Sequence, residues 1–208
     1  PAAARNIKAW LESLRIDTAF DVERIANLNF VLKEKIGESG EWNLSGDRYR
    51  DDALIERTAW PVVQLGDLCT FMTGGTPTST KIEYYENGEV PWLVSGDIHQ
   101  GKIHDCEKRI TKLGVENSNS KVFPFNSVLI ALNGQGKTRG TVALLRMRNA
   151  TSNQSIVSIN PINNDVLQSE YLFYVLRSMY QQIRNLTGDE QRSGLNIPII
   201  KRIKIPLP

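Results

Sequence analysis

Residues 128–143 have the sequence VLIALNGQGKTRGTVA. The first five residues form an unbroken apolar run that is partly β-branched, a pattern typical of a buried strand. A polar loop with three glycines follows, and glycine lets the backbone turn at positive φ. A second β-prone run begins at Thr141. The stretch therefore predicts two strands joined by a glycine-rich loop.

The loop carries two cations, Lys137 and Arg139, which alternate with small residues and are expected on one rim. Backbone N–H groups, side-chain amides and positive charge together favour an anionic ligand. The plainer alternative is a hairpin turn that binds nothing.

Residues 131–138 also fit a relaxed P-loop pattern for nucleotide phosphates. A true P-loop leads into a helix, whose N-terminus holds the phosphates. Here Gly140 and β-branched residues follow, which is a poor first helical turn. Ala131 also replaces the first glycine of the strict motif. The pattern therefore argues against ATP binding.

Composition is that of an ordinary globular protein of one or two domains, with 208 residues, 40% hydrophobic and 23% charged. No apolar run approaches the roughly 20 residues that span a bilayer. The chain begins without Met or a signal peptide, so we expect a fragment of a longer protein. Cys69 and Cys106 form neither a metal motif nor a disulfide framework, so a reducing, cytoplasmic setting is expected.

Net charge is +2 but unevenly distributed. Residues 1–58 contain 9 Lys/Arg and 11 Asp/Glu, whereas residues 59–208 contain 16 and 12. The resulting excess of +4 in the second part permits nucleic-acid binding without requiring it.

Hydrophobic periodicity divides the chain at about residue 58. Helices are predicted at 7–15 and 21–36, followed by a charge-rich linker. Strands and loops dominate from Trp60 onward. We expect strands within 60–73, 90–98, 103–110, 128–132, 141–146 and 155–159, the last two paired, then a helix capped by Asp165 and ended by Gly188, and final strands within 197–206.

Catalytic and metal-binding patterns are weak. Two histidines without Cys or Glu at ligand spacing do not predict a zinc site. A triad of Ser95, His104 and Asp97 lacks a nucleophile elbow. Asn160-Pro161 begins a motif similar to that of amino-methylating DNA methyltransferases, but the second proline and the aromatic residue are missing. No catalytic residue, metal or cofactor is therefore predicted, and the chain is expected to be a binding protein.

From Trp60 to Pro208 the chain resembles a target recognition domain of type I restriction–modification specificity subunits. Each matching piece is short, but their number and order are specific. The pieces are Trp60-Pro61, Leu65-Gly66-Asp67, Gly74-Gly75-Thr76-Pro77, Pro91-Trp92-Leu93, Ser95-Gly96-Asp97-Ile98, Ile110-Thr111, Gly114, Val128-Leu129, residues 134–140, Asn153-Gln154, Tyr171-Leu172, Tyr174, Leu176, Gly188, Gln191, Leu195-Asn196 and Ile205-Pro206-Leu207-Pro208.

The resemblance implies an α+β fold at residues 59–208, a curved, partly barrel-like β-sheet domain with peripheral helices. Such a domain reads one half of a bipartite DNA site and directs adenine methylation or cleavage by other subunits. Residues 1–58 are expected to be a small helical segment. Residues 42–49 resemble the end of an adenine-specific modification subunit, which implies a parent protein that carries an N6-adenine methyltransferase.

The implied partners are double-stranded DNA, the modification (methyltransferase) subunit and, through the complex, the restriction subunit. A second recognition domain or a second copy of the chain is a further expected partner, and no membrane is expected. The alternative is a protein-interaction domain that docks methyltransferase or specificity subunits without reading DNA.

Candidate DNA-binding residues follow from side-chain chemistry and from the resemblance, because cations contact phosphates and polar loop residues read base edges. The phosphate candidates are Lys81, Lys102, Lys108, Arg109, Lys137 and Arg139. The base-reading candidates are Thr76, Ser79, Asn133, Gln135, Asn153, Gln154 and Arg192.

Overall fold

The computed structural model describes Lys33 and residues 59–134, 137–186 and 194–208. The chain divides into two units, residues 1–51 and 52–208. Lys33 is helical. The rest of the helices expected at 7–15 and 21–36 lies outside the described residues.

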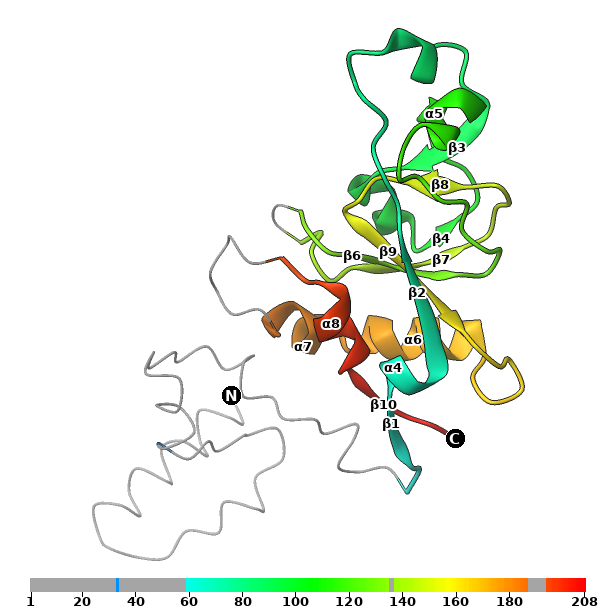
Figure 1. Ribbon diagram of the computed structural model, residues 1–208. Helices are drawn as coiled ribbons and strands as arrows, with labels where there is room; N and C mark the ends of the chain where they lie inside the picture. The colour runs from blue at the N-terminus through cyan, green and yellow to red at the C-terminus, as the bar shows by residue number, and fades with distance from the viewer. Residues whose placement is uncertain (1–32, 34–58, 135–136, 187–193) are drawn as a thin grey trace, which may run out of the picture. The chain divides into compact units, whose positions relative to one another are not determined.

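A five-stranded sheet forms the centre of the second unit (Figure 1). Its middle strand, β6 (Val128–Ala131), pairs antiparallel with β7 (Val142–Leu145) and with β9 (Ile156–Pro161). The predicted pair of strands joined by a glycine-rich loop is therefore confirmed. The predicted pairing of the strands near 141–146 and 155–159 is wrong, because β6 lies between them.

The edges of this sheet are β2 (Cys69–Thr73), antiparallel to β9, and β4 (Lys102–Ile103), parallel to β7. All four residues of β6 and all four of β7 are buried. Figure 1 shows α6 and α7 on one face of the sheet and β3, β8 and α5 on the other. Alternate residues of β6 therefore enter two different cores.

The core beneath the helices takes Val128 and Ile130 of β6 together with Phe173 and Leu176. The core on the opposite face takes Leu129 and Ala131 of β6. The period of two in a strand explains this division. The main members of the opposite core are Leu93, Ile98, Ile103, Phe123, Leu129, Leu145 and Ile156.

The other described strands form two small sheets, with orders β5-β3-β8 and β1-β10. The mixed α+β class is confirmed, and the sheets of the described residues are open and separate. Their elements are β1 (Val62–Gln64), α4 (Leu65–Leu68), η3 (Ile82–Tyr84), β3 (Val90–Leu93), η4 (Ser95–Gln100), β5 (Arg109–Ile110), α5 (Lys112–Glu116), β8 (Thr151–Ser152) and β10 (Lys204–Pro206).

The helix predicted to be capped by Asp165 instead has Gln168 at its N-cap and is interrupted. α6 spans Ser169–Ser178 and α7 spans Tyr180–Asn185, with Met179 between them at φ −88° and ψ 10°. Asp165 lies in a turn before the helix, where its N–H donates to the Asn163 side chain at 2.9 Å. The bend leaves Met179 and Ile183 buried in the same core.

The segment predicted as terminal strands contains a helix, α8 (Ile197–Lys201), before β10. The Asn196 side chain caps it by accepting from the Ile199 N–H at 3.0 Å. Pro198 lies in the first turn, where the N–H that it lacks would have no helical partner. Pro198 thus marks the start of a helix in a segment where strands were expected.

None of the helices in the described part of the chain is long and apolar enough to cross a membrane. The two cysteines are free thiols with buried side chains. Burial raises the pKa of the Cys69 thiol to about 12 and also raises that of Cys106. Both thiols are therefore mainly protonated and shielded at neutral pH.

We predict that Gly74→Ala destabilises the domain by roughly 1–3 kcal/mol, the usual range for an overpacked site. A Cβ at Gly74 would lie 2.0 Å from the Ser152 carbonyl oxygen, so backbone must move. Gly96→Ala is the matched control, because its Cβ would have no neighbour within 4 Å. Urea unfolding of both variants measures the difference. Equal stability of the two variants would contradict the close packing at Gly74.

Candidate nucleic-acid interface

Polar residues from three segments lie near the C-terminal end of β6. The Thr76 hydroxyl donates to the Gln154 amide oxygen at 2.5 Å, across 78 residues of sequence. The Leu132 N–H donates to the Ser155 carbonyl at 2.8 Å, which places Asn133 beside the β8–β9 turn. Thr76, Asn133 and Gln154 are exposed. The structure thus brings together base-reading candidates that are far apart in sequence.

Asn153 belongs to the same turn but is half-buried. Its side-chain oxygen accepts from the Ser155 N–H at 3.0 Å, and its own N–H donates to the Leu93 carbonyl at 3.0 Å. Asn153 therefore shapes the turn that presents Gln154.

The segment that carries Thr76 is fixed to the body of the domain. The Gly75 carbonyl accepts from Trp92 Nε1 at 3.0 Å and from the Ser120 hydroxyl at 2.7 Å. The Tyr85 hydroxyl donates to the Pro77 carbonyl at 2.5 Å. These bonds hold Thr76 in position before any ligand binds, which lowers the ordering cost of recognition.

Ser79 and Lys81 continue this segment, and both are exposed. The Lys81 ammonium lies 3.1 Å from the Tyr84 hydroxyl and 5.1 Å from the centre of that ring. Ser79 and Lys81 therefore provide one hydroxyl and one cation, a few residues after Thr76 in the same segment.

The loop between β6 and β7 folds against other elements. The Lys137 carbonyl accepts from the hydroxyls of Tyr180 and Thr141, both at 2.7 Å. His99 Nε2 lies 3.0 Å from the Thr138 hydroxyl oxygen. Strand β7 follows the loop directly. The helix that a P-loop requires does not follow, as the sequence predicted.

The two cations of this loop differ in exposure. Lys137 is exposed, whereas Arg139 is half-buried and its Nε atom is buried. Lys137 is thus the more accessible of the two. Gln135 and Arg192 lie outside the described residues.

A cavity of about 350 Å³ lies between this loop, η4 and the helices α6 and α7. Lys137, Arg177 and His99 bring positive or ionisable groups to it, and Tyr180 brings a hydroxyl. Nearby, the Lys102 ammonium lies 5.7 Å from the centre of the exposed Tyr174 ring. The arrangement can accept an anionic group.

His99, Arg177 and Tyr180 were not among the residues that the sequence selected. Arg177 and Tyr180 are three positions apart in the predicted helix, outside its apolar stripe. The spacing of three indicates that Arg177 and Tyr180 lie on the same helix face. Every solvent-exposed helix face contains such pairs, so the spacing does not mark these two residues as functional.

Lys108 and Arg109 lie elsewhere, at the edge strand β5. Arg109 forms an ion pair of 2.6 Å with Asp105, and its hydrogen bond lowers the pKa of that carboxyl group. Its other nitrogen donates to the Cys106 carbonyl. Arg109 thus holds the β4–β5 connection together, while Lys108 is exposed.

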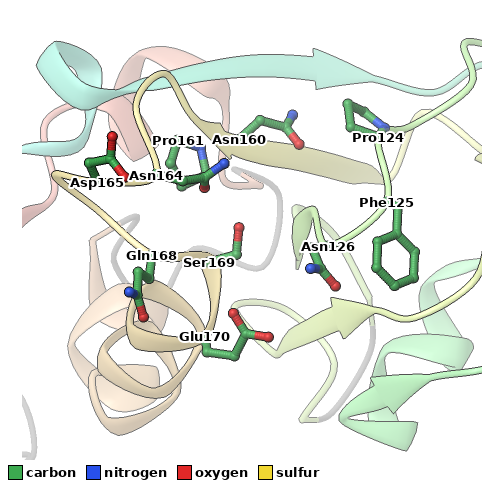
Figure 2. A pocket seen from close by; sticks show the side chains of 10 residues that line it. All are labelled: Pro124, Phe125, Asn126, Asn160, Pro161, Asn164, Asp165, Gln168, Ser169 and Glu170. Atoms are coloured by element: carbon green, nitrogen blue, oxygen red, sulfur yellow. The ribbon is translucent and has the colours of Figure 1, made fainter.

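A second cavity, of about 450 Å³, lies at the opposite end of β6 (Figure 2). The Asn160 side-chain oxygen accepts from the Ser127 hydroxyl at 2.5 Å, and its nitrogen donates to the Ser158 hydroxyl at 2.8 Å. Arg146 bonds Asn126 at 2.6 Å and Glu170 at 2.8 Å. These groups mainly bond one another, so the methyltransferase-like Asn160-Pro161 has a structural role here.

Among the described residues, no group of three or more His, Cys, Asp and Glu side chains is placed to hold a metal ion. The site therefore consists of a polar part, formed by Thr76, Asn133 and Gln154, and a cationic part around the 350 Å³ cavity. The β6–β7 loop joins the two.

Residues 58–208 match the model of the type I restriction modification DNA specificity domain, and the chain belongs to this family. The chain is 28% identical over 196 residues to the Escherichia coli type I restriction enzyme EcoR124I/EcoR124II specificity subunit, covering 92% of this chain and 45% of that protein. It is 29% identical over 154 residues to the MjaIX specificity subunit of Methanocaldococcus jannaschii, covering 72% and 34%. The chain thus spans less than half the length of these relatives.

Solved structures show the same fold. The HsdS subunit from Thermoanaerobacter tengcongensis matches with a TM-score of 0.53 and 19% identity, covering 100% of this chain and 45% of that one. A chain from a study of complex assembly and conformational transition of the type I R-M system matches with a TM-score of 0.54 and 16% identity, covering 100% and 42%.

We predict that Tyr85→Phe destabilises the domain by about 0.5–1.5 kcal/mol, the usual contribution of one hydrogen bond. The change removes only the hydroxyl that donates to Pro77, and it keeps the ring, which packs edge-on against Trp92. Tyr174→Phe is the control, because Tyr174 is 55% exposed and its ring contact with Lys102 survives. If thermal and urea unfolding show Tyr85→Phe to be as stable as the control, the anchoring of this segment is refuted.

Proposed function

We propose that this chain reads DNA sequence for a type I restriction–modification system. It would recognise one half of a bipartite site and direct adenine methylation and cleavage by other subunits or domains. The chain itself is a specificity domain and performs no chemistry. The observation that carries the proposal is the bond between Thr76 and Gln154 at the end of β6 where the cationic loop that carries Asn133 begins.

The chemistry of the polar part suits base recognition. Side-chain amides of Asn and Gln can donate to and accept from one base edge, and adenine offers both functions in the major groove. The Thr76 hydroxyl fixes the Gln154 amide, with the Gln154 oxygen accepting, which leaves the donating amide nitrogen for a base acceptor in this proposal. We assign Asn133, Gln154 and Thr76 to base reading, together with Ser79, Gln135 and Arg192.

The cations suit sequence-independent contacts with phosphates. Lys81, Lys102, Lys108 and Lys137 are exposed and supply most of the affinity in this proposal. Arg139 and Arg109 contribute less, because both are half-buried and Arg109 is paired with Asp105. The partly barrel-like curvature of the sheets, also part of the proposal, would wrap these side chains along a duplex.

We further propose that residues 59–208 are the recognition domain and that residues 1–58 are the end of a methyltransferase polypeptide. The family match begins at residue 58, which supports this boundary, and residues 42–49 resemble the end of a modification subunit. The proposed partners are DNA, the modification subunit and, through the complex, the restriction subunit. A second recognition domain, or a second copy of this chain, would read the other half of the site.

Selection on random duplexes at low salt tests this function, and we predict enrichment of one short motif. Gln154→Ala relaxes one position of that motif by about 1–3 kcal/mol, because a bidentate amide contact is lost. Gln181→Ala is the control, since that exposed glutamine lies on α7. Binding without any enriched motif, or no binding at all, would refute sequence reading and favour a docking role.

A further inference from the structure

We propose that the 350 Å³ cavity beside α6 and α7 holds one phosphate of the DNA backbone. Arg177 and Lys137 contact the phosphate, and Tyr180 positions Lys137. This inference rests on the proposed function and adds to it a defined phosphate position and two residues on the helices.

The charge of the cavity is one-sided. Two of its eight lining residues, Lys137 and Arg177, are cations, a third is His99, and none of the eight is acidic. The two cations, Lys137 and Arg177, are 40 positions apart in the sequence. Such convergence without a neutralising carboxylate favours an anion.

Gly101 lines the cavity beside Arg177. This residue has φ +75°, a conformation that favours glycine, and a Cβ there would come within 3.4 Å of the Arg177 guanidinium. Arg177 lies over the Phe173 ring, with 5.7 Å between the guanidinium carbon and the ring centre. The aromatic contact orients the guanidinium without neutralising it.

The Lys137 backbone is held before any ligand arrives. The Tyr180 hydroxyl donates to the Lys137 carbonyl at 2.7 Å, and Arg184 donates to the same hydroxyl at 3.1 Å. Thr141 adds a second hydroxyl to that carbonyl. Tyr180 therefore sets where the Lys137 side chain leaves the backbone, and both cations start from fixed points.

The cavity and the polar part also share one loop. Asn133 and Lys137 both lie on this loop. Thr138 follows Lys137, and its hydroxyl lies 3.0 Å from Nε2 of His99, which lines the cavity. A duplex whose base edges face Asn133 and Gln154 would present its backbone along this loop. A free phosphate ion has the same chemistry as a backbone phosphate, so the experiment must separate these two sources.

The test measures the affinity of the whole chain for duplex DNA as a function of KCl, with a selected and a random duplex. Removing one phosphate contact lowers the slope of log K against log salt by about 0.9. For Arg177→Ala we expect this change on both duplexes, so that between 50 and 200 mM salt the wild type loses roughly 3.5-fold more affinity than the variant. Arg177→Lys restores the slope, because it restores the charge.

Two further variants distinguish the loss of this phosphate contact from a general loss of positive charge or of folding. Lys204→Ala removes an equally exposed cation on β10, in the separate two-stranded sheet, and leaves the slope unchanged. Tyr180→Phe removes the hydroxyl that positions Lys137, so affinity falls on both duplexes while the wild-type motif is still selected. Circular dichroism of each variant verifies folding.

The outcomes distinguish the two proposals. A wild-type chain that selects a motif, with an Arg177→Ala slope equal to that of wild type, overturns the cavity and leaves DNA reading intact. A wild-type chain that selects no motif ends the proposed function first. In a third arm, sodium phosphate at equal ionic strength replaces KCl: Arg177-dependent binding of free phosphate without any change in the DNA slope would assign the cavity to a free anion.

Discussion

Burial of β6 and β7 on both faces is the constraint on which the rest of this domain depends. Val128 and Ile130 face the helices, while Leu129 faces the opposite core. Strands covered on both faces meet solvent only at their ends. One end carries the self-bonded network around Asn160, and the other carries the polar part and the cationic loop. The proposed site lies at the second end.

Much of this architecture follows from local pattern. An unbroken apolar run predicted β6, and the glycine-rich loop predicted the turn into β7, because both signals act between neighbouring residues. The pairing of β7 with β9 was predicted wrongly. β9 pairs instead with β6, although β7 and β8 lie between them in the sequence, and hydrophobic periodicity does not reveal such a non-local pairing. The helix at Pro198 and the break at Met179 were also not predicted. A proline fits a strand edge and a first helical turn equally well, so Pro198 does not distinguish the two. At Met179, core packing bends α6 into α7 without a Gly or Pro at the break.

The candidate site was less accessible to sequence reasoning. Thr76 and Gln154 are partners across 78 residues, and neither residue type marks such a bond in advance. The resemblance indicated the class of function, and the family match supports it. It did not indicate Arg177 or Tyr180, because their role comes from where α6 and α7 meet the β6–β7 loop. Arg109 shows the converse: its sequence suggested a phosphate contact, and its geometry shows an ion pair with Asp105.

Directed DNA cleavage tests the central claim, that the end of β6 carrying Asn133 faces the duplex. Because Cys69 and Cys106 are buried, an iron–EDTA reagent can be attached selectively to an introduced exposed cysteine. Thr78→Cys lies in the segment of Thr76, and Asn164→Cys lines the cavity at the opposite end of β6. We predict that the reagent at position 78 cleaves the DNA within the selected motif and that the reagent at position 164 does not. Cleavage within the motif from position 164 alone would contradict it.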